Sequence, residues 1–119
     1  MVILVTEDVD DTRELMRLLL EHFGHEVETA ANGKLALEAV ARRMPDLILM
    51  DLRMPVMDGF TATRLIRETP EAAAVPIIAV SAYVRDKVWH DKAIAAGCND
   101  CIPKPVDHEK LQRLLAHYA

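Results

Sequence analysis

Three short, continuous apolar runs stand out along the chain, at residues 2–5, 47–50 and 77–80. None of them alternates apolar with polar positions, so each is predicted to be a strand buried on both faces, as in a parallel sheet. Two further segments, residues 26–30 and 100–102, are weaker strand candidates. Residues 26–30 alternate, which suits a sheet edge, and residues 100–102 form a short run.

Helical periodicity fills the segments between these strands. The first helix is expected to begin near Asp11, which forms a capping pair with Glu14, and to end at Gly24. Its core face is predicted to hold Met16, Leu19, Leu20 and Phe23, widened by Leu18. The other helices are expected from Asn32-Gly33 to about Arg43, over 60–68, over 86–96 before Gly97, and after the cap Asp107.

Strands that alternate with helices predict an α/β fold of three layers, with a parallel sheet and right-handed crossovers. A length of 119 residues fits one domain, residues 1–119. The formal charge of −5, with basic residues scattered, argues against a nucleic-acid partner. No apolar run reaches the length of a membrane span, and two cysteines are too few to staple the domain, so we expect a cytoplasmic protein.

The strand ends carry the candidate chemistry, because an open parallel sheet binds its ligands outside the carboxyl ends of its strands. The polar residues at these ends are Glu7-Asp8, Asp51, Ser81-Ala82 and Lys104-Pro105. Three carboxylates that meet at one edge repel one another unless a cation is present. Oxygen ligands favour a hard divalent ion, so we predict a Mg²⁺ site with Lys104 as a second positive charge.

Each of these residues also has a purely structural interpretation. Acids after a strand are often helix caps, as we expect for Asp10 and Asp11. Taken alone, Asp51 fits a turn and Ser81 a capping hydroxyl. Four strand ends that each supply a residue suited to one reaction favour a functional site over these alternatives.

The order and spacing of these residues resemble the receiver domain of bacterial two-component response regulators. The resemblance extends from Val2 to Tyr118 and is most specific in the stretch LILMDLRMPVMDG around Asp51. It implies a flavodoxin-like (βα)5 fold in three layers, with a five-stranded parallel sheet in the order 2-1-3-4-5.

By this resemblance Asp51 is the phosphoryl acceptor. The donor would be a phosphohistidine of a histidine kinase or a histidine phosphotransfer protein. Mg²⁺ would bind Asp8 and Asp51 directly, Glu7 through water, and the backbone carbonyl of Arg53. Such a domain is not an enzyme with other substrates, because it promotes only its own phosphorylation and dephosphorylation.

The resemblance also implies a switch. Lys104, the Ser81 hydroxyl and the Ala82 backbone N–H would contact the phosphoryl group, and the Lys104–Pro105 peptide bond would be cis. Phosphorylation would then repack the surface formed by the fourth helix, the fifth strand and the fifth helix. Cys101 stands where the family has an aromatic residue, so we predict a weaker or differently routed transition.

Two surfaces are candidates for protein partners. By the resemblance, Thr12 and Leu15, together with Pro105 and Val106, form the docking surface for the helix that bears the donor histidine. Trp89 is the only tryptophan and lies near the start of the fourth helix. It is either buried locally or an anchor for a downstream protein. The domain is expected to be a monomer, or a dimer that forms on phosphorylation.

Several alternatives stay open at this point. The Cys98-x-x-Cys101 pair suggests a redox or zinc site, but it follows a helix and has no second pair. A haloacid-dehalogenase-type phosphatase would have a second acid at position 53, where this chain has Arg53. A receiver that binds partners without phosphorylation is a third alternative. The chain looks like a stand-alone regulator, with a receiver excised from a hybrid histidine kinase as the other possibility.

Overall fold

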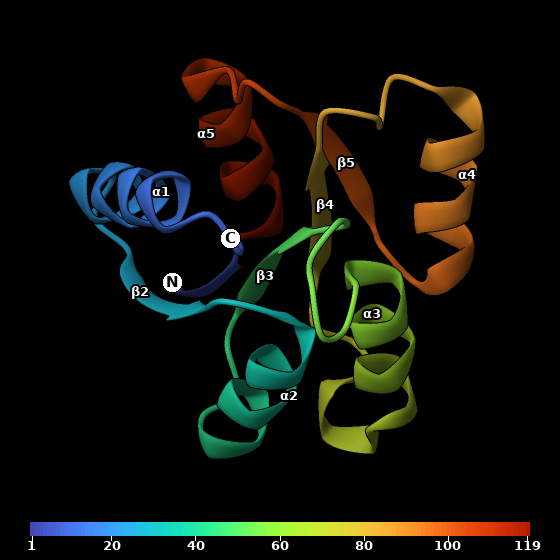
Figure 1. The fold of residues 1–119 in the computed structure, drawn as a ribbon. Helices are drawn as coiled ribbons and strands as arrows, with labels where there is room; N and C mark the ends of the chain where they lie inside the picture. Colours follow the sequence, from blue (N-terminus) through green and yellow to red (C-terminus); the bar gives the residue numbers. More distant parts are fainter.

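Five strands and five α-helices alternate along the chain in the computed structural model, which describes residues 1–119 (Figure 1). In chain order the elements are β1 Val2–Thr6, α1 Asp10–His22, β2 Glu26–Ala30, α2 Gly33–Arg42, β3 Leu47–Asp51, α3 Gly59–Glu68, the 3₁₀ turn η1 Pro70–Ala72, β4 Ile77–Ser81, α4 Lys87–Ala96, β5 Asp100–Pro103 and α5 His108–Tyr118. The predicted α/β class is confirmed. None of the helices is both long and apolar enough to cross a bilayer.

The sheet is parallel throughout and has the order β2-β1-β3-β4-β5, which confirms the predicted flavodoxin-like topology. β2 lies at an edge, as its alternating sequence predicts. From β1 the strand order runs outward to β2 on one side, and from β3 it runs outward to β4 and β5 on the other. β1 and β3 pair in parallel, so their carboxyl ends lie side by side, with Thr6 opposite Met50. Ser81 at the end of β4 lies opposite Pro103 in β5. These four strand ends therefore share one edge of the sheet.

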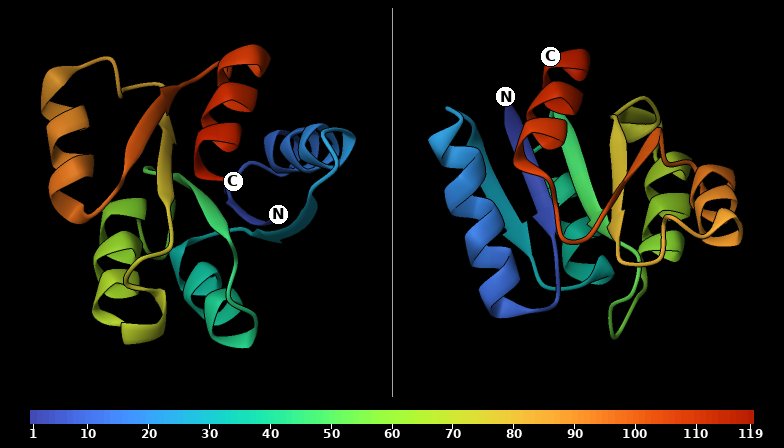
Figure 2. Two further views of the ribbon diagram at one scale, coloured as in Figure 1. Left: turned by 180° about the vertical axis from the view of Figure 1, so that it is seen from behind. Right: turned by 90° about the horizontal axis from the view of Figure 1, so that it is seen from above.

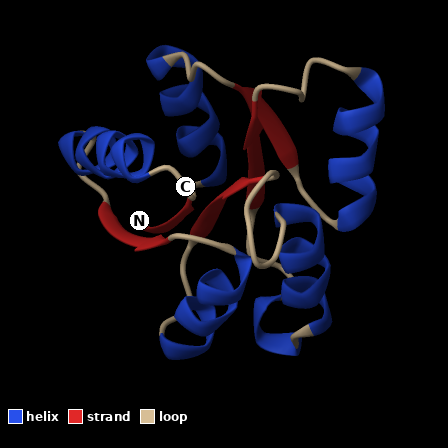
Figure 3. Ribbon diagram, in the orientation of Figure 1, coloured by secondary structure: helices blue, strands red, loops and turns tan.

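Helices cover both faces of the sheet (Figures 2 and 3). Successive residues of a strand point to opposite faces, so β3 contributes Leu47 and Leu49 to the core beneath α1 and α5. It contributes Ile48 and Met50 to the core shared with α2, α3 and α4. This two-sided burial explains why β3 reads as a continuous apolar run.

The start of α1 differs from the prediction. The helix begins at Asp10, and its N-cap is Val9, which makes no side-chain capping bond. The Asp11–Glu14 capping pair is therefore wrong: Asp10 and Asp11 lie inside the first turn, where their charge favours the positive end of the helix. The predicted burial of Leu18 is also wrong, since this side chain is 52% exposed.

Candidate functional site

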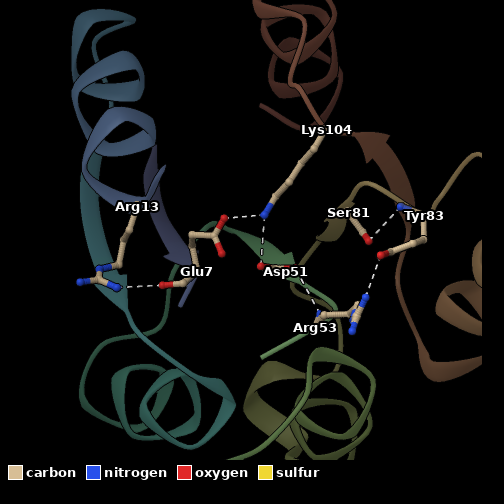
Figure 4. A network of polar contacts seen from close by, with 7 residues as sticks. All are labelled: Glu7, Arg13, Asp51, Arg53, Ser81, Tyr83 and Lys104. Atoms are coloured by element: carbon tan, nitrogen blue, oxygen red, sulfur yellow. Dashed lines mark hydrogen bonds and ion pairs between the residues drawn. The ribbon is translucent and has the colours of Figure 1, made fainter. Parts of the chain in front are cut away.

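Lys104 joins two of the three acids at the carboxyl edge of the sheet (Figure 4). Its Nζ lies 2.5 Å from Glu7 Oε1 and 3.2 Å from Asp51 Oδ2. One carboxylate oxygen from each of Glu7, Asp8 and Asp51 lies within 4.8 Å of the others. β1, β3 and β5 thus bring together residues that are far apart in the sequence.

Burial makes this cluster electrostatically demanding. Glu7 is 4% exposed and Asp51 6% exposed. Burial raises the pKa of Glu7, and the neighbouring Asp51 adds to the increase, while Lys104 opposes it. Burial alone would lower the pKa of Lys104, but its hydrogen bond to Glu7 and the charges of both acids raise it. One ammonium group therefore holds the carboxylates of Glu7 and Asp51 together.

The arrangement of donors fits a Mg²⁺ ion. Glu7 Oε2 is buried and has no hydrogen-bond partner, although Oε1 of the same group binds Lys104. Buried carboxylate oxygens without a partner are costly, and a hard divalent ion is the partner that such oxygens prefer. Asp8, which is only partly buried, offers a further oxygen toward the open side.

An open cleft of about 680 Å³ lies over these residues. Its lining includes Asp8, Asp51, Arg53, Ser81, Ala82 and Lys104. Tyr83 donates its backbone N–H to Ser81 Oγ at 3.2 Å, so the Ser81 hydroxyl proton stays free for another acceptor. The Lys104–Pro105 peptide bond is cis, as the resemblance implied.

The loop after β3 holds Asp51 in place. The Arg53 backbone N–H donates to Asp51 Oδ1 at 3.2 Å, and the Asp58 side chain caps α3 by accepting from Thr61. Gly59 packs so closely that a Cβ there would lie 2.1 Å from the Asp51 carbonyl oxygen. Only glycine allows this approach, so the Asp58-Gly59 pair in the sequence sets the position of the strand end.

A second, more apolar groove of about 850 Å³ runs beside α1 and also reaches Asp51 and Lys104. The four residues predicted to dock the donor helix all line it: Thr12, Leu15, Pro105 and Val106. Leu15 is 68% exposed, so an apolar side chain faces solvent at this groove.

Two predicted residues lie in surroundings that the sequence did not specify. Trp89 lines the open cleft and is partly buried against Phe60 and Tyr83. This favours its local burial over a freely exposed anchor. Cys101 is buried in the core cluster that it shares with Cys98, and both thiols are free. Burial raises the pKa of Cys98 and raises that of Cys101 to about 11, so neither thiol is activated as a redox pair requires.

The sequence did not predict two side-chain hydrogen bonds next to the acidic cluster. Arg13 donates to the Glu7 backbone carbonyl at 2.9 Å, and Arg53 donates to the Tyr83 hydroxyl at 2.8 Å (Figure 4). The only sequence signal of the second contact is that Arg53 and Tyr83 lie two positions after the site residues Asp51 and Ser81.

Known proteins of closely similar structure and sequence include receivers from several bacteria. The receiver domain of a sensor histidine kinase from Pseudomonas aeruginosa PAO1, which has magnesium coordinated in its active-site cleft, superposes with a TM-score of 0.91 at 36% identity, covering 98% of this chain and 95% of that one. Chemotaxis protein CheY4 of Vibrio cholerae superposes with a TM-score of 0.92 at 28% identity, and the match covers 99% of this chain and 98% of CheY4.

Curated relatives carry this domain in two settings. Protein PilH of Pseudomonas aeruginosa is 35% identical over 115 residues, which cover 95% of this chain and 93% of PilH. The histidine kinase BarA of Escherichia coli K12 is 38% identical over 119 residues, but this chain spans only 13% of its length. Residues 3–116 match the response regulator receiver domain as a family. The chain therefore belongs to the response regulator receiver domains of two-component signal transduction, a family in which an aspartate accepts the phosphoryl group and an acidic site binds Mg²⁺.

Proposed function

We propose that this domain is phosphorylated on Asp51. The observation that carries the proposal is the position of Asp51 at the end of the central strand β3. There its buried carboxylate lies 3.2 Å from Lys104 Nζ, beside Glu7 and Asp8, and lines an open cleft. Family membership makes a phosphoryl acceptor at this edge the expected chemistry.

The donor is a phosphohistidine of a histidine kinase or a histidine phosphotransfer protein. An Asp51 carboxylate oxygen bonds to phosphorus as the P–N bond to the imidazole breaks, and the electron pair stays on the imidazole nitrogen. Lys104 pairs with a phosphoryl oxygen. The Ser81 hydroxyl and the Ala82 backbone N–H donate to the other oxygens, because the Ser81 proton is not engaged elsewhere.

Glu7, Asp8 and Asp51, with the Arg53 backbone carbonyl, form the proposed Mg²⁺ site. Bound Mg²⁺ supplies positive charge that offsets the acids and the incoming phosphoryl oxygens. The unpartnered Glu7 Oε2 supports this assignment. Asp8 supplies its oxygen from the partly exposed side of the cluster.

The groove beside α1 is the proposed docking site for the donor helix. Thr12, Leu15, Pro105 and Val106 line it, and the same groove reaches Asp51, so a helix seated there places its histidine near the acceptor. An amphipathic helix in an apolar groove is a common mode of recognition. The α4–β5–α5 surface is the proposed site for a downstream protein target and for any phosphorylation-dependent dimer.

Residues 1–119 are proposed to act as one receiver domain in the cytoplasm. The two buried free cysteines, Cys98 and Cys101, are compatible with a reducing compartment. The domain fits a stand-alone regulator, such as PilH, and a hybrid kinase, such as BarA, equally well.

Phosphorylation of Asp51 is tested with acetyl phosphate and Mg²⁺ followed by intact-mass measurement. We expect one added phosphoryl group on the wild-type chain and none on Asp51→Asn. Asp58→Asn is the matched control, because Asp58 lines the same cleft and asparagine also caps a helix. We expect it to be phosphorylated.

A persistent adduct on Asp51→Asn would place the acceptor elsewhere. A wild-type chain that gains no phosphoryl group, even from a phosphorylated histidine kinase, would favour a receiver that only binds partners.

A further inference from the structure

A continuous series of side-chain contacts leads from the acceptor edge to α4. The Arg53 guanidinium donates to the Tyr83 hydroxyl at 2.8 Å, and its carbon lies 5.1 Å from the Tyr83 ring centroid. The Tyr83 ring stacks on Trp89, with centroids 5.0 Å apart and planes 26° apart. The ring centroids of Trp89 and Phe60 lie 5.6 Å apart, and Lys92 Nζ lies 4.5 Å from the Phe60 ring centroid. We call these five residues the aromatic ladder.

The first two members of the ladder are attached to the site through their backbones. The Arg53 N–H donates to Asp51 Oδ1, and the Tyr83 N–H donates to Ser81 Oγ, each at 3.2 Å. Both acceptor atoms belong to groups that the phosphoryl group would contact, because Asp51 Oδ1 is on the carboxylate that would be modified and the Ser81 hydroxyl would donate its free proton to a phosphoryl oxygen. Figure 4 shows Arg53 and Tyr83 facing each other across this side of the site.

The first members of the ladder are free to respond. Arg53 is exposed and Tyr83 is 43% exposed, and both line the cleft in which the phosphoryl group would lie. A doubly charged group there attracts the nearby guanidinium away from the neutral Tyr83 hydroxyl. Aromatic stacking of this kind stabilises no more than a single hydrogen bond does, so the loss of the Arg53 bond is enough to shift the Tyr83 ring relative to Trp89.

Position 101 offers no comparable connection. Cys101 is 9% exposed within the core and has no side-chain hydrogen bond to Ser81 or to any other site residue. Its small side chain also fills little volume if it moves. Contacts between the site and α4 are made instead by Tyr83 and Trp89.

We propose that the aromatic ladder transmits the phosphorylation state of Asp51 to α4, with Arg53 and Tyr83 as positioning residues. The proposal rests on Asp51 being the acceptor. The charge added at Asp51 exchanges the Arg53–Tyr83 bond for an Arg53–phosphoryl bond. The Tyr83 ring then moves relative to Trp89, and α4 repacks with it.

Trp89 is the only tryptophan, so its fluorescence reports on the ladder directly. The experiment treats the protein with acetyl phosphate and Mg²⁺ and records, on one sample, the intact mass, the Trp89 emission and the backbone amide shifts of α4. In the wild type we expect one added phosphoryl group, a changed emission and shifted α4 amides. Tyr83→Phe keeps the ring but removes the hydroxyl, so its emission change is expected to be at least twofold smaller at equal phosphorylation.

Two arginine variants complete the test. Arg53→Gln is expected to reduce the emission change as Tyr83→Phe does. Arg85→Gln is its matched control, since it removes an exposed positive charge near Tyr83 that takes no part in the ladder, and it is expected to respond like the wild type.

The outcomes separate this proposal from the proposed function. A wild type that gains the phosphoryl group with unchanged emission and unchanged α4 amides overturns the ladder and leaves Asp51 as the acceptor. So does a full emission change in both Tyr83→Phe and Arg53→Gln. A wild type that gains no phosphoryl group overturns the acceptor and the ladder together.

Discussion

Val56 is the one non-glycine residue with a positive φ, at 69°. The Met57 N–H donates to the Pro55 carbonyl at 2.7 Å, so Val56 is the central residue of a γ-turn of the strained, positive-φ kind. A β-branched side chain makes this conformation particularly unfavourable. The side chain is 77% exposed, so no burial offsets the strain.

Replacing Val56 with asparagine or glycine should therefore stabilise the domain. Asparagine tolerates positive φ, and we expect Val56→Asn to raise the free energy of unfolding by about 1 kcal/mol, as measured by urea denaturation. Val56→Gly should gain less, because glycine also adds entropy to the unfolded chain. Val88→Asn is the control: Val88 is 73% exposed but helical, so asparagine should give no gain there. Equal gains at both positions would mean that surface polarity, and not backbone strain, is responsible.

Short-range signals explain what could be predicted at the level of single elements. Gly24 and Gly97 follow α1 and α4 with φ of 93° and 119°, where glycine is favoured, so both helix ends followed from the sequence. Asn32 caps α2 by accepting from Leu35, again a local contact. The cap predicted at Asp11 was wrong because four acids, Glu7, Asp8, Asp10 and Asp11, follow β1 within five residues, and the helix begins at Asp10, one residue before the predicted cap.

The cap of α5 should make this helix sensitive to acid. The hydrogen bond from the Lys110 backbone N–H to Asp107 holds the pKa of that carboxyl below its ordinary value of 3.8. A group whose pKa is lower in the folded state contributes stability above its unfolded pKa and loses it as pH falls through the folded pKa. Asp107→Asn keeps the cap without the charge, so its loss of Tm between pH 6 and acidic pH should be smaller than the wild type's.

Asp107→Ala separates the cap from the charge. Alanine removes both, so this variant should be less stable than Asp107→Asn at every pH. The interpretation fails if wild type and Asp107→Asn lose the same Tm on acidification.

Arg67 connects three elements. From α3 its guanidinium donates to the Gly97 carbonyl at 2.9 Å, to the Val75 carbonyl at 2.7 Å and to Asn99 Oδ1 at 2.7 Å. Asn99 Oδ1 also accepts from the Ile77 N–H, so the start of β4 depends on the same group.

We expect Arg67→Met to lower the free energy of unfolding by about 2–4 kcal/mol in urea denaturation. Methionine keeps the packing of the stem but leaves partly buried acceptors without a donor. Arg64→Met, one turn earlier on the exposed side of α3, should change stability by less than about 0.5 kcal/mol. Similar losses in both variants would show that helix propensity, not the connection, determines the cost.

At the scale of the molecule, the meeting of residues 7, 51 and 104 could be predicted because parallel strands place their carboxyl ends at one edge. That rule depends only on which segments are strands. The Arg53–Tyr83 contact could not be predicted, because it requires the paths of two loops and the rotamers of two long side chains. The tight approach of Gly59 to Asp51 is likewise visible only in three dimensions.

The crowding of acids at this edge should couple Mg²⁺ to the stability of the whole fold. An ion that binds only the folded state adds about 1.4 kcal/mol at a free concentration ten times its Kd. For a domain of this size that corresponds to a rise in Tm of about 3–6 °C relative to a sample with EDTA. Asp8→Asn removes one proposed ligand and one repelling charge. It should therefore lose most of the Mg²⁺ increment, while its metal-free Tm equals or exceeds that of the wild type.

Asp11→Asn gives the matched control for this measurement, because Asp11 is an exposed acid of α1 outside the cluster. It should keep the full increment, since a general screening effect of Mg²⁺ acts on every surface acid alike but a bound ion acts only on its ligands. If Asp8→Asn and Asp11→Asn respond to Mg²⁺ equally, the ion is not held by this cluster, and Lys104 alone balances the charges of Glu7 and Asp51.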